Sequence, residues 1–91
     1  MEFEWDPNKA KHNSRKHRVD FQEATTVFVD PLSVTYPDPD HGFEEDRYII
    51  IGMSDHNRLL IVSHTDRGDI TRIISARTAK RPERKLYENA S

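Results

Sequence analysis

The sequence predicts an α+β domain in which helices pack on a mostly antiparallel sheet, in the order β-α-α-β-β-β-β-α. Two observations predict this class. Helix-start signals are concentrated in the first 30 residues and recur once near the carboxyl end, whereas residues 32–76 hold short apolar runs separated by tight turns. The chain has 91 residues, so we expect one compact domain over residues 1–91.

The first expected elements are a short strand at residues 3–5 and a helix that follows it directly. Residues 3–5 alternate apolar and polar side chains, as a strand does. Asp6 and Pro7 then form a strong helix start, because Asp caps free N–H groups and Pro fits the first turn. We expect this helix to reach about residue 17 and to lie on the surface, because Ala10 is its one certain core contact.

A second helix is expected to begin after Asp20. Asp20 and Glu23 have the spacing of a capping box, in which both side chains bond to free backbone N–H groups. Apolar residues then recur at helical spacing and give the helix a buried face: Phe21, Ala24, Val27 and Phe28. The helix should stop before Asp30 and Pro31, because a residue that precedes proline is disfavoured in the helical region.

Four strands and a final helix are expected in the rest of the chain. Apolar and β-branched residues mark the strands at residues 32–36, 46–53, 58–65 and 70–76. The connecting segments at residues 37–42, 54–57 and 66–69 are rich in Pro, Gly, Asp and Asn, so the four strands should form a meander. Pro82 suits the first turn of a helix that runs through Tyr87.

Composition and charge favour a small soluble protein with a basic face. Apolar residues make up 34% of the chain and charged residues 33%, so a permanent partner would supplement a limited core. The net charge of −2 hides basic segments at residues 8–18 and 70–87 around an acidic one at residues 38–46, although ordinary solvated helix faces would look the same. With no cysteine, no apolar run of about 18 residues and no signal-type start, we expect a cytoplasmic protein without membrane segments.

The stretch from Ile70 to Tyr87 carries the strongest functional signal. It begins as a strand, continues as a helix, and holds several cations against the single acid Glu83. The cations are Arg72, Arg77, Lys80, Arg81, Arg84 and Lys85. A strand end that leads into a basic helix with a carboxylate and a tyrosine can bind an anion, a phosphate above all.

An ordered set of segments across nearly the whole chain resembles one family, the BrnT toxins. The segments are FEWDPNKAKHN, RKHRVDFQEA, TVFVDPL, EEDRYIIIG, RLLIVSHT, RIISAR and RPERKLY. BrnT proteins are ribonuclease toxins of type II toxin–antitoxin pairs, and the resemblance implies a compact RelE-like fold. The chain departs from the family pattern at Arg18, where glycine is more usual, and at Pro82, where a charged residue is common.

The resemblance also implies an activity and partners. The implied activity is that of a metal-independent endoribonuclease, which needs no cofactor and inhibits translation by cutting RNA. The implied partner is a BrnA-like antitoxin with a ribbon-helix-helix domain, so that a hetero-oligomer of the two proteins represses its own operon. This chain shows no evident DNA-binding motif, so we expect operator DNA to be contacted only through the antitoxin.

Metal-free RNA cleavage uses the 2′-hydroxyl as nucleophile and needs a base, an acid, and cations around the phosphate. Arg77 is the first candidate, because a guanidinium at the end of the last strand can hold two phosphate oxygens. Strict strand alternation places Arg72 on the opposite sheet face, where we expect a structural ion pair or an antitoxin contact. The alternative for Arg77 is an ion pair with Glu45 or Asp46.

Glu83, Arg84 and Tyr87 are the candidates on the final helix. Glu83 and Tyr87 are four residues apart and share a helix face, with Arg84 on its flank. The surrounding cations should lower the pKa of Glu83, which favours an ionised base, and Tyr87 could stack on a nucleobase or bond to a phosphate. The alternatives are structural, since Glu83 also complements the helix N-terminus and Tyr87 could pack in the core.

His64, Lys16 and His17 are further candidates from other segments. His64 could act as an acid or base near neutral pH, or could be a core-edge histidine. Lys16 and His17 end the first helix and could close over RNA, although cations are favoured at a helix C-terminus in any case. The other expected RNA contacts are Lys80, Arg81, Arg84 and Arg67. No HExxH motif or cysteine pair is present, so we expect no metal site.

Two other functions are consistent with the same residues. A non-catalytic module could use the basic face to bind RNA or an acidic protein. The fold could also serve mainly as the structural half of a repressor complex. The sequence leaves open which of Glu83, His64, Lys16 and Tyr87 is the general base and which the general acid.

Overall fold

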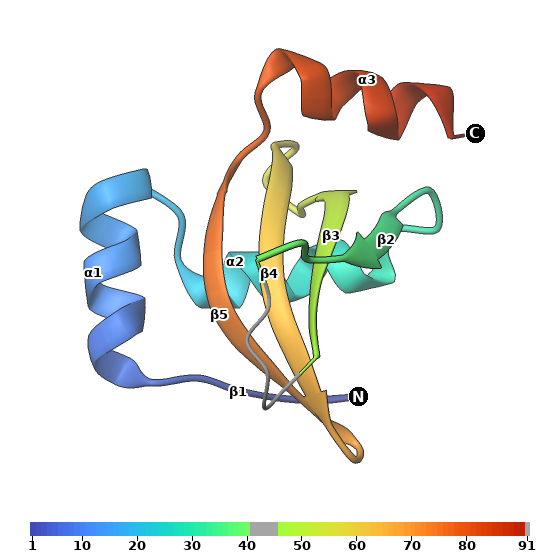
Figure 1. Cartoon of the computed structure of the whole chain (residues 1–91). Coiled ribbons are helices and arrows are strands. Elements are labelled where there is room, and N and C mark those ends of the chain that lie inside the picture. Colours follow the sequence, from blue (N-terminus) through green and yellow to red (C-terminus); the bar gives the residue numbers. More distant parts are fainter. Residues whose placement is uncertain (41–45, 91) are drawn as a thin grey trace.

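A computed structural model describes residues 1–40 and 46–90, and its elements follow the predicted order. Five strands form one sheet in the spatial order β1-β5-β4-β3-β2 (Figure 1). The strands are β1 (Glu2–Glu4), β2 (Val34–Pro37), β3 (Arg47–Met53), β4 (Leu59–Arg67) and β5 (Ile70–Thr78). The helices are α1 (Pro7–His17), α2 (Phe21–Thr26), the 3₁₀ turn η1 (Val27–Val29) and α3 (Arg81–Asn89).

The two helix starts predicted in the first 30 residues are confirmed, but the capping box at Asp20 is only half formed, because the Glu23 carboxylate accepts hydrogen bonds from Ser54 and Arg58 instead of the backbone of residue 20. The Asp6 carboxylate accepts a hydrogen bond from the Asn8 backbone at 2.8 Å, and the Asp20 carboxylate accepts one from the Glu23 backbone at 2.7 Å. Arg18 follows the last residue of α1 and caps it, and its left-handed conformation (φ 59°) explains why a glycine would be favoured there. The second helix is shorter than predicted, because its last turn tightens into η1 before Asp30.

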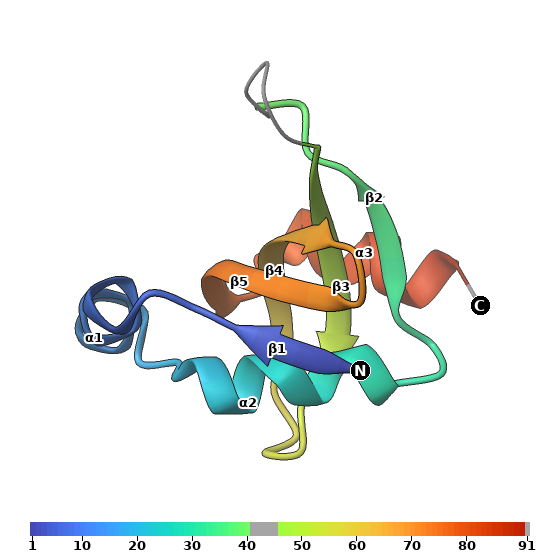
Figure 2. The same cartoon turned by 90° about the horizontal axis from the view of Figure 1, so that it is seen from below.

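The sheet separates two apolar clusters. Strands β2 to β5 pair as the predicted antiparallel meander, whereas β1 pairs parallel with β5 and so lies outside it. Helix α2 covers one face, here called the α2 face, and α3 covers the upper part of the other, the α3 face (Figures 1 and 2). The α2 cluster includes Phe21, Val27, Leu60, Val62, Ile73 and Ala76, and the α3 cluster includes Ile51, Leu59, Ile61 and, at its margin, Tyr87.

A β-bulge in β5 overturns the predicted strand alternation. Ser75 pairs with Ser63 and Ile73 pairs with His64, so Ile74 is an extra residue without a partner on β4. Side chains therefore change face across Ile74, and Ile73 and Ala76 both enter the α2 cluster. The prediction that Arg72 and Arg77 point to opposite faces is wrong.

The two arginines share the α3 face. Antiparallel partners place their side chains on the same side of a sheet. Arg77 pairs with Ile61 and Arg72 with Thr65, four residues apart on β4. Arg72 also lies 3.5 Å from the carboxylate of Glu4 on β1, and this ion pair is the first of the two roles that we expected for it.

A buried asparagine fixes the polar helix α1 to the sheet. The Asn13 amide donates to the carbonyl oxygens of Val19 at 2.9 Å and Ala76 at 2.8 Å, and its oxygen accepts from the Ala76 N–H at 3.1 Å. Asn13 is 5% exposed and continues the hydrogen bonding of β5 next to the bulge. These three hydrogen bonds, here called the Asn13 clamp, explain how a helix with so little apolar surface stays attached to the sheet. The role of Asn13 is therefore structural.

We expect Asn13→Ala to lower the free energy of unfolding by about 2–4 kcal/mol, because it leaves a buried N–H and two buried carbonyls without their partner. The exposed Asn8 on the same helix is the matched control, and Asn8→Ala should cost less than about 0.5 kcal/mol. Urea unfolding followed by circular dichroism measures both. Equal stability of the two variants would contradict the claim that the hydrogen bonds of Asn13 stabilise the attachment of α1 to the sheet.

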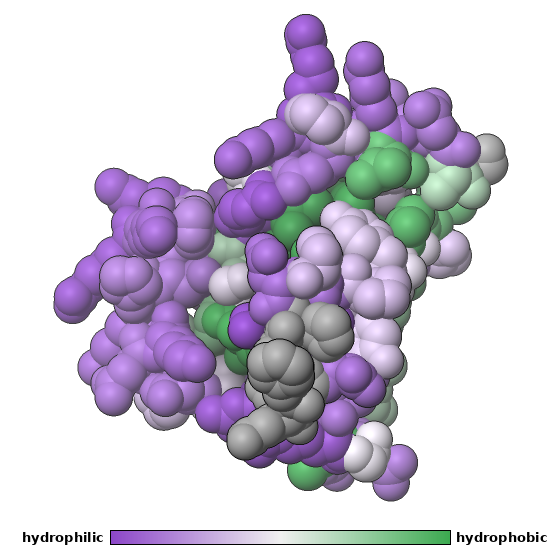
Figure 3. Space-filling model, in the orientation of Figure 1, coloured by the Kyte–Doolittle hydropathy of each residue, from purple (hydrophilic) through white to green (hydrophobic). Residues whose placement is uncertain are grey.

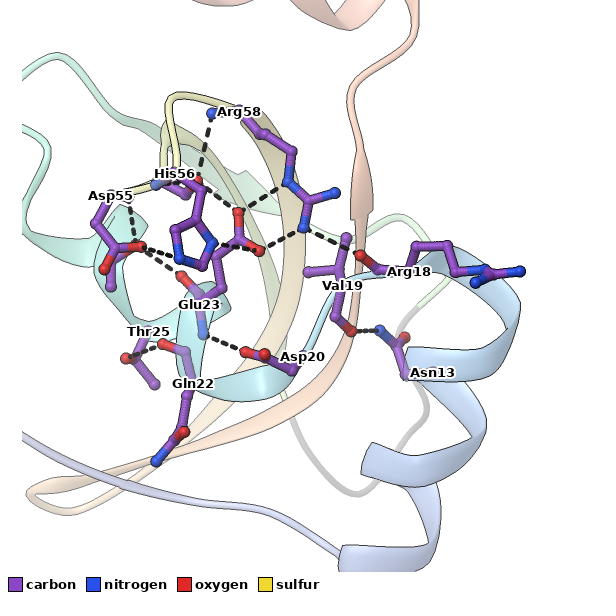
Figure 4. A network of polar contacts seen from close by, with 12 residues as sticks. Asn13, Arg18, Val19, Asp20, Gln22, Glu23, Thr25, Asp55, His56 and Arg58 are labelled. Carbon is purple, nitrogen blue, oxygen red and sulfur yellow. Dashed lines mark hydrogen bonds and ion pairs between the residues drawn. The ribbon is translucent and has the colours of Figure 1, made fainter.

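A second polar network joins α2 to the β3–β4 turn (Figure 4). The Glu23 carboxylate is buried and accepts hydrogen bonds from Arg58 Nε at 3.0 Å, from Arg58 Nη2, and from the Ser54 hydroxyl at 2.7 Å. His56 Nδ1 lies 3.1 Å from the same carboxylate. The hydrogen bond from Arg58 is the largest of several contacts that lower the pKa of Glu23 to about 2.

Candidate active site

The site is built around the upper end of β5, where the strand leads into α3. Arg77 is next to last in β5, and the first turn of α3 holds Glu83. In Figure 1 the last turn of α1 lies on one side of this strand end and α3 begins above it. Figure 3 shows that the exposed surfaces of α1 and α3 here are mostly hydrophilic. The fold thus brings two of the basic segments of the sequence to one end of the sheet.

Arg77 and Glu83 form a fork-to-fork ion pair. Nη1 of Arg77 donates to Oε1 of Glu83 at 2.8 Å, and Nη2 donates to Oε2 at 2.5 Å. Oε1 also accepts the Lys80 backbone N–H at 2.8 Å, so Glu83 caps α3 as well. The hydrogen bonds from Arg77 lower the pKa of Glu83, which agrees with the predicted direction. The predicted alternative partner Asp46 is not the partner of Arg77, and Glu45 lies outside the described residues.

This pairing leaves one edge of the Arg77 guanidinium available. A guanidinium has five N–H donors arranged around its plane. Glu83 accepts hydrogen bonds from the end of the guanidinium formed by Nη1 and Nη2. Nη1 also donates its second hydrogen to the Thr78 carbonyl oxygen, with 3.2 Å between the nitrogen and the oxygen. Nε and the second Nη2 hydrogen have no acceptor among the described residues. That edge has the geometry to donate two parallel hydrogen bonds to a phosphate.

Tyr36 on β2 is a neighbour of this ion pair that sequence reasoning missed. Burial, and next the negative charge of Glu83, raise the pKa of the Tyr36 hydroxyl. It therefore stays protonated at neutral pH and can donate a hydrogen bond. It has no hydrogen-bond partner among the residues that the structure describes. The sequence marked Tyr36 only as a strand residue, because β2 meets β5 through two intervening strands.

Tyr87 is engaged with the protein itself. Its hydroxyl donates to Oδ2 of Asp30 at 2.6 Å, which raises the pKa of Tyr87 to about 12, and its ring packs against the α3 cluster. The Asp30 carboxylate also accepts the Met53 and Leu32 backbone N–H groups, at 2.8 and 2.9 Å. The core-packing alternative therefore describes the Tyr87 ring, whereas its hydroxyl anchors α3 to the rest of the domain.

A cationic pocket lies between α1 and β5. It has a volume of about 350 Å³, and its lining includes Lys9, His12, Lys16, His17 and Ser75. The four basic side chains form no ion pair with a carboxylate in the described ranges 1–40 and 46–90. Burial, and next the positive charges of Lys16 and Arg77, lower the pKa of His17. His17 is thus electrostatically coupled to Arg77, and its imidazole is neutral near pH 7.

The other predicted RNA contacts divide between the two ends of the sheet. Lys80, Arg81 and Arg84 are exposed at the start of α3, near Arg77. Arg67 pairs with Ile70 at the β4–β5 turn, whereas Arg77 pairs with Ile61 at the far end of the same ladder. The structure therefore does not bring Arg67 to the site.

His64 does not face the site either. It pairs with Ile73, so it points to the α2 face, away from Arg77. Its ring packs edge-on against Phe28, with centroids 4.9 Å apart, and stacks on Tyr48 at 6.0 Å. His64 therefore does not serve as an acid or base beside Arg77, because strand pairing turns its side chain to the other side of the sheet. The alternative of a histidine at the edge of the core describes it better.

Two further expectations concern metals and membranes. Among residues 1–40 and 46–90, no group of three or more His, Cys, Asp or Glu side chains is arranged to hold a metal ion. Nor does any helix in these ranges have the length and apolar character needed to cross a membrane.

Comparisons with known proteins agree with this architecture. The family model described as the ribonuclease toxin BrnT of type II toxin–antitoxin systems matches residues 5–83. The crystal structure of the Brucella abortus ribonuclease toxin BrnT is similar, with a TM-score of 0.70 and 24% identity, over 89% of this chain and 99% of that one. A comparison with curated proteins finds no match.

Proposed function

Because the chain belongs to the BrnT family of ribonuclease toxins of type II toxin–antitoxin systems, we propose that it cleaves RNA at Arg77 without a metal ion. The observation that carries this proposal is the Arg77–Glu83 pair. Glu83 holds the guanidinium from one end through two hydrogen bonds and leaves its Nε edge without an acceptor among the described residues. A cation that is fixed before substrate arrives stabilises a developing phosphorane more effectively than a mobile one.

The surrounding side chains supply the remaining roles in the proposed reaction. His17 is the best candidate for the general base, because its lowered pKa favours the neutral imidazole, which can accept the proton of the 2′-hydroxyl. Glu83 is a weaker base, because both of its oxygens already accept hydrogen bonds. Tyr36 and Lys16 can donate hydrogen bonds to the phosphate or to the leaving 5′-oxygen. In this arrangement Glu83 is a positioning residue for Arg77, and Tyr87 supports α3 through Asp30.

One cleavage experiment distinguishes the ribonuclease hypothesis from the hypothesis of a non-catalytic binding module. We expect the purified chain to cut a single-stranded RNA in the presence of EDTA, with a denaturing gel as the readout. A chain that binds the RNA and leaves it intact would favour the non-catalytic alternative. Cleavage that appears only when Mg²⁺ is restored would contradict the metal-independent mechanism.

The cationic pocket on α1 should hold a phosphate next to the one that is cut. We expect Lys16→Ala to weaken RNA binding and to lower the slope of log affinity against log salt by about 0.7, the value for one contact to a single strand. Lys11→Ala removes the same charge from the same helix outside the pocket and is the matched control. Fluorescence anisotropy with a 2′-O-methyl RNA, which cannot be cleaved, measures both. Equal slopes would place the phosphate elsewhere.

Family membership also implies an antitoxin partner. We propose a BrnA-like partner with a ribbon-helix-helix domain, which covers part of the basic site in a cytoplasmic hetero-oligomer and represses the shared operon. Inhibition requires acidic side chains on that partner, which pair with the cations around Arg77, or apolar side chains that cover the site. Operator DNA should shift in a gel with the complex and not with this chain alone. A shift by this chain alone would contradict the assignment of DNA binding to the partner.

A further inference from the structure

A hollow on the α2 face lies at the opposite end of β5 from Arg77. It has a volume of about 680 Å³ and is bordered by the amino end of the chain, the β4–β5 turn and the edge strand β2. Figure 2 views the molecule from this end, with β1 and β2 on either side. Neither the proposed cleavage nor the cationic pocket uses any residue of this hollow.

His64 forms an unusual part of its wall. The His64 side chain is 6% exposed, yet neither ring nitrogen has a hydrogen-bond partner within the described part of the chain. Nδ1 lies 3.6 Å from the carboxylate of Asp66, which is itself held by the Thr71 hydroxyl at 3.1 Å. Burial lowers the pKa of His64, so near pH 7 the ring is neutral and one nitrogen is a free acceptor. Buried polar atoms without partners are rare, and a ligand is one explanation for them.

The rest of the lining is acidic and partly aromatic. The hollow is bordered by the carboxylates of Glu2, Asp66 and Asp69, together with the ring of Phe28 and the hydroxyl of Thr35. Carboxylates repel a phosphate, so RNA is excluded as the occupant. An apolar floor with acceptors at its rim matches an amphipathic cation, whose aliphatic stem packs on Phe28 while its charged head meets the acceptors.

We propose that this hollow binds an arginine or lysine side chain of a protein partner. Charge complementarity between the three carboxylates and the cationic head selects this occupant. The guanidinium or ammonium pairs with Asp66, whose carboxylate lies 3.6 Å from Nδ1 of His64. Both ring nitrogens are buried in the structure, so the ring turns toward the bound head to accept its hydrogen bond. The proposal is independent of the ribonuclease function, because the hollow and Arg77 lie on opposite sheet faces.

The test uses protein whose histidine residues are labelled with ¹³C, and a tripeptide that contains arginine, acetyl-Ala-Arg-Ala-amide. We expect the His64 ring signals to shift in ¹H–¹³C NMR spectra, with a dissociation constant on the order of 1–10 mM for so small a ligand. His12, His17 and His56 lie outside the hollow and serve as internal controls. The same peptide with citrulline, which has the shape of arginine without its charge, should cause no shift.

Matched variants separate the carboxylates of the hollow from general surface charge. Asp66→Asn keeps the acceptor for Thr71 and should weaken binding about threefold to fivefold, as expected for one partly exposed charge pair. Asp55→Asn changes the same charge outside the hollow and should leave binding unaltered. The proposal fails if His64 does not respond to arginine, if citrulline shifts it equally, or if the free polyamine spermidine binds more tightly than the peptide.

Discussion

Arg77→Ala is expected to lower the rate of RNA cleavage by about 10²–10³-fold, because it removes the fixed cation that faces the phosphorane. Arg77→Lys keeps one positive charge but cannot donate two parallel hydrogen bonds while it remains paired with Glu83. We therefore expect the lysine variant to recover only a small part of the activity. Single-turnover cleavage of a fluorescent RNA, at saturating protein, measures the chemical step apart from binding.

Arg72→Ala is the matched control for this experiment. Arg72 lies on the same strand and on the same sheet face, and it is also held by a single glutamate. We expect its loss to change the rate less than about tenfold, because it lies nearer the opposite end of the β4–β5 ladder. Thermal melting of each variant shows whether the fold is retained. If the Arg77 variants are folded and cut at the wild-type rate, Arg77 is not the centre of the site.

Glu23→Gln is expected to lower the free energy of unfolding by about 3 kcal/mol, the stabilisation that corresponds to the lowered pKa of this buried carboxylate beside the partly exposed Arg58. Arg58 would lose the carboxylate that holds its Nε and Nη2 atoms, and the β3–β4 turn would lose its main attachment to α2 (Figure 4). Gln22→Ala, on the exposed side of the same helix, is the control and should cost less than about 0.5 kcal/mol. Chemical denaturation measures both variants.

The double variant Glu23→Gln with Arg58→Met distinguishes a damaged ion pair from general loss of packing. Removal of both charges should restore part of the lost stability, because the partly buried Arg58 no longer stands without a partner. Simple addition of the two single effects would contradict the interpretation of these residues as one coupled pair.

The same carboxylate predicts how stability depends on pH. Its pKa falls from an ordinary value of 4.5 to about 2 in the folded chain, so the unfolded state binds a proton first as pH decreases. The contribution is complete above about pH 5 and is lost as the pH falls toward 2, and it amounts to about 3 kcal/mol. Glu23→Gln should remove this part of the acid sensitivity. An unchanged acid denaturation profile in that variant would contradict the lowered pKa.

Local signals account for the parts of the fold that the sequence predicts well. The caps at Asp6 and Asp20 act on backbone groups two or three residues away, and the tight turns at residues 54–57 and 66–69 join strands that are adjacent in the chain. The element order and the antiparallel pairing of β2 to β5 were confirmed for this reason. The similarity to the Brucella abortus toxin supports the predicted fold as well.

The errors arise where distant segments decide the structure. The bulge at Ile74 is not visible in a strand sequence, yet it changes the face of every residue on one side of it and so reversed the relation of Arg72 to Arg77. Parallel pairing of β1 with β5 depends on residues about 68 positions apart in the chain, as in the pair of Glu2 with Ile70.

The candidate site was predicted in part for the same reason. Arg77, Glu83 and Arg84 lie within eight residues of one another, and Lys16 and His17 line the pocket between α1 and β5. Tyr36 and Asp30 were missed, because they meet α3 only through the folded sheet. Asp30 could have been noticed as the acid before Pro31, although its hydrogen bond to Tyr87 could not.

The chemical end groups of the cleaved RNA test the central claim most directly. If the 2′-hydroxyl attacks a phosphate held by Arg77, the products in EDTA must carry a 2′,3′-cyclic phosphate or its opened 3′-phosphate, and a free 5′-hydroxyl. Mass spectrometry of a short defined RNA identifies these groups, with Arg77→Ala as the inactive control. Products with a 3′-hydroxyl and a 5′-phosphate would show that water is the nucleophile and would contradict the proposed site.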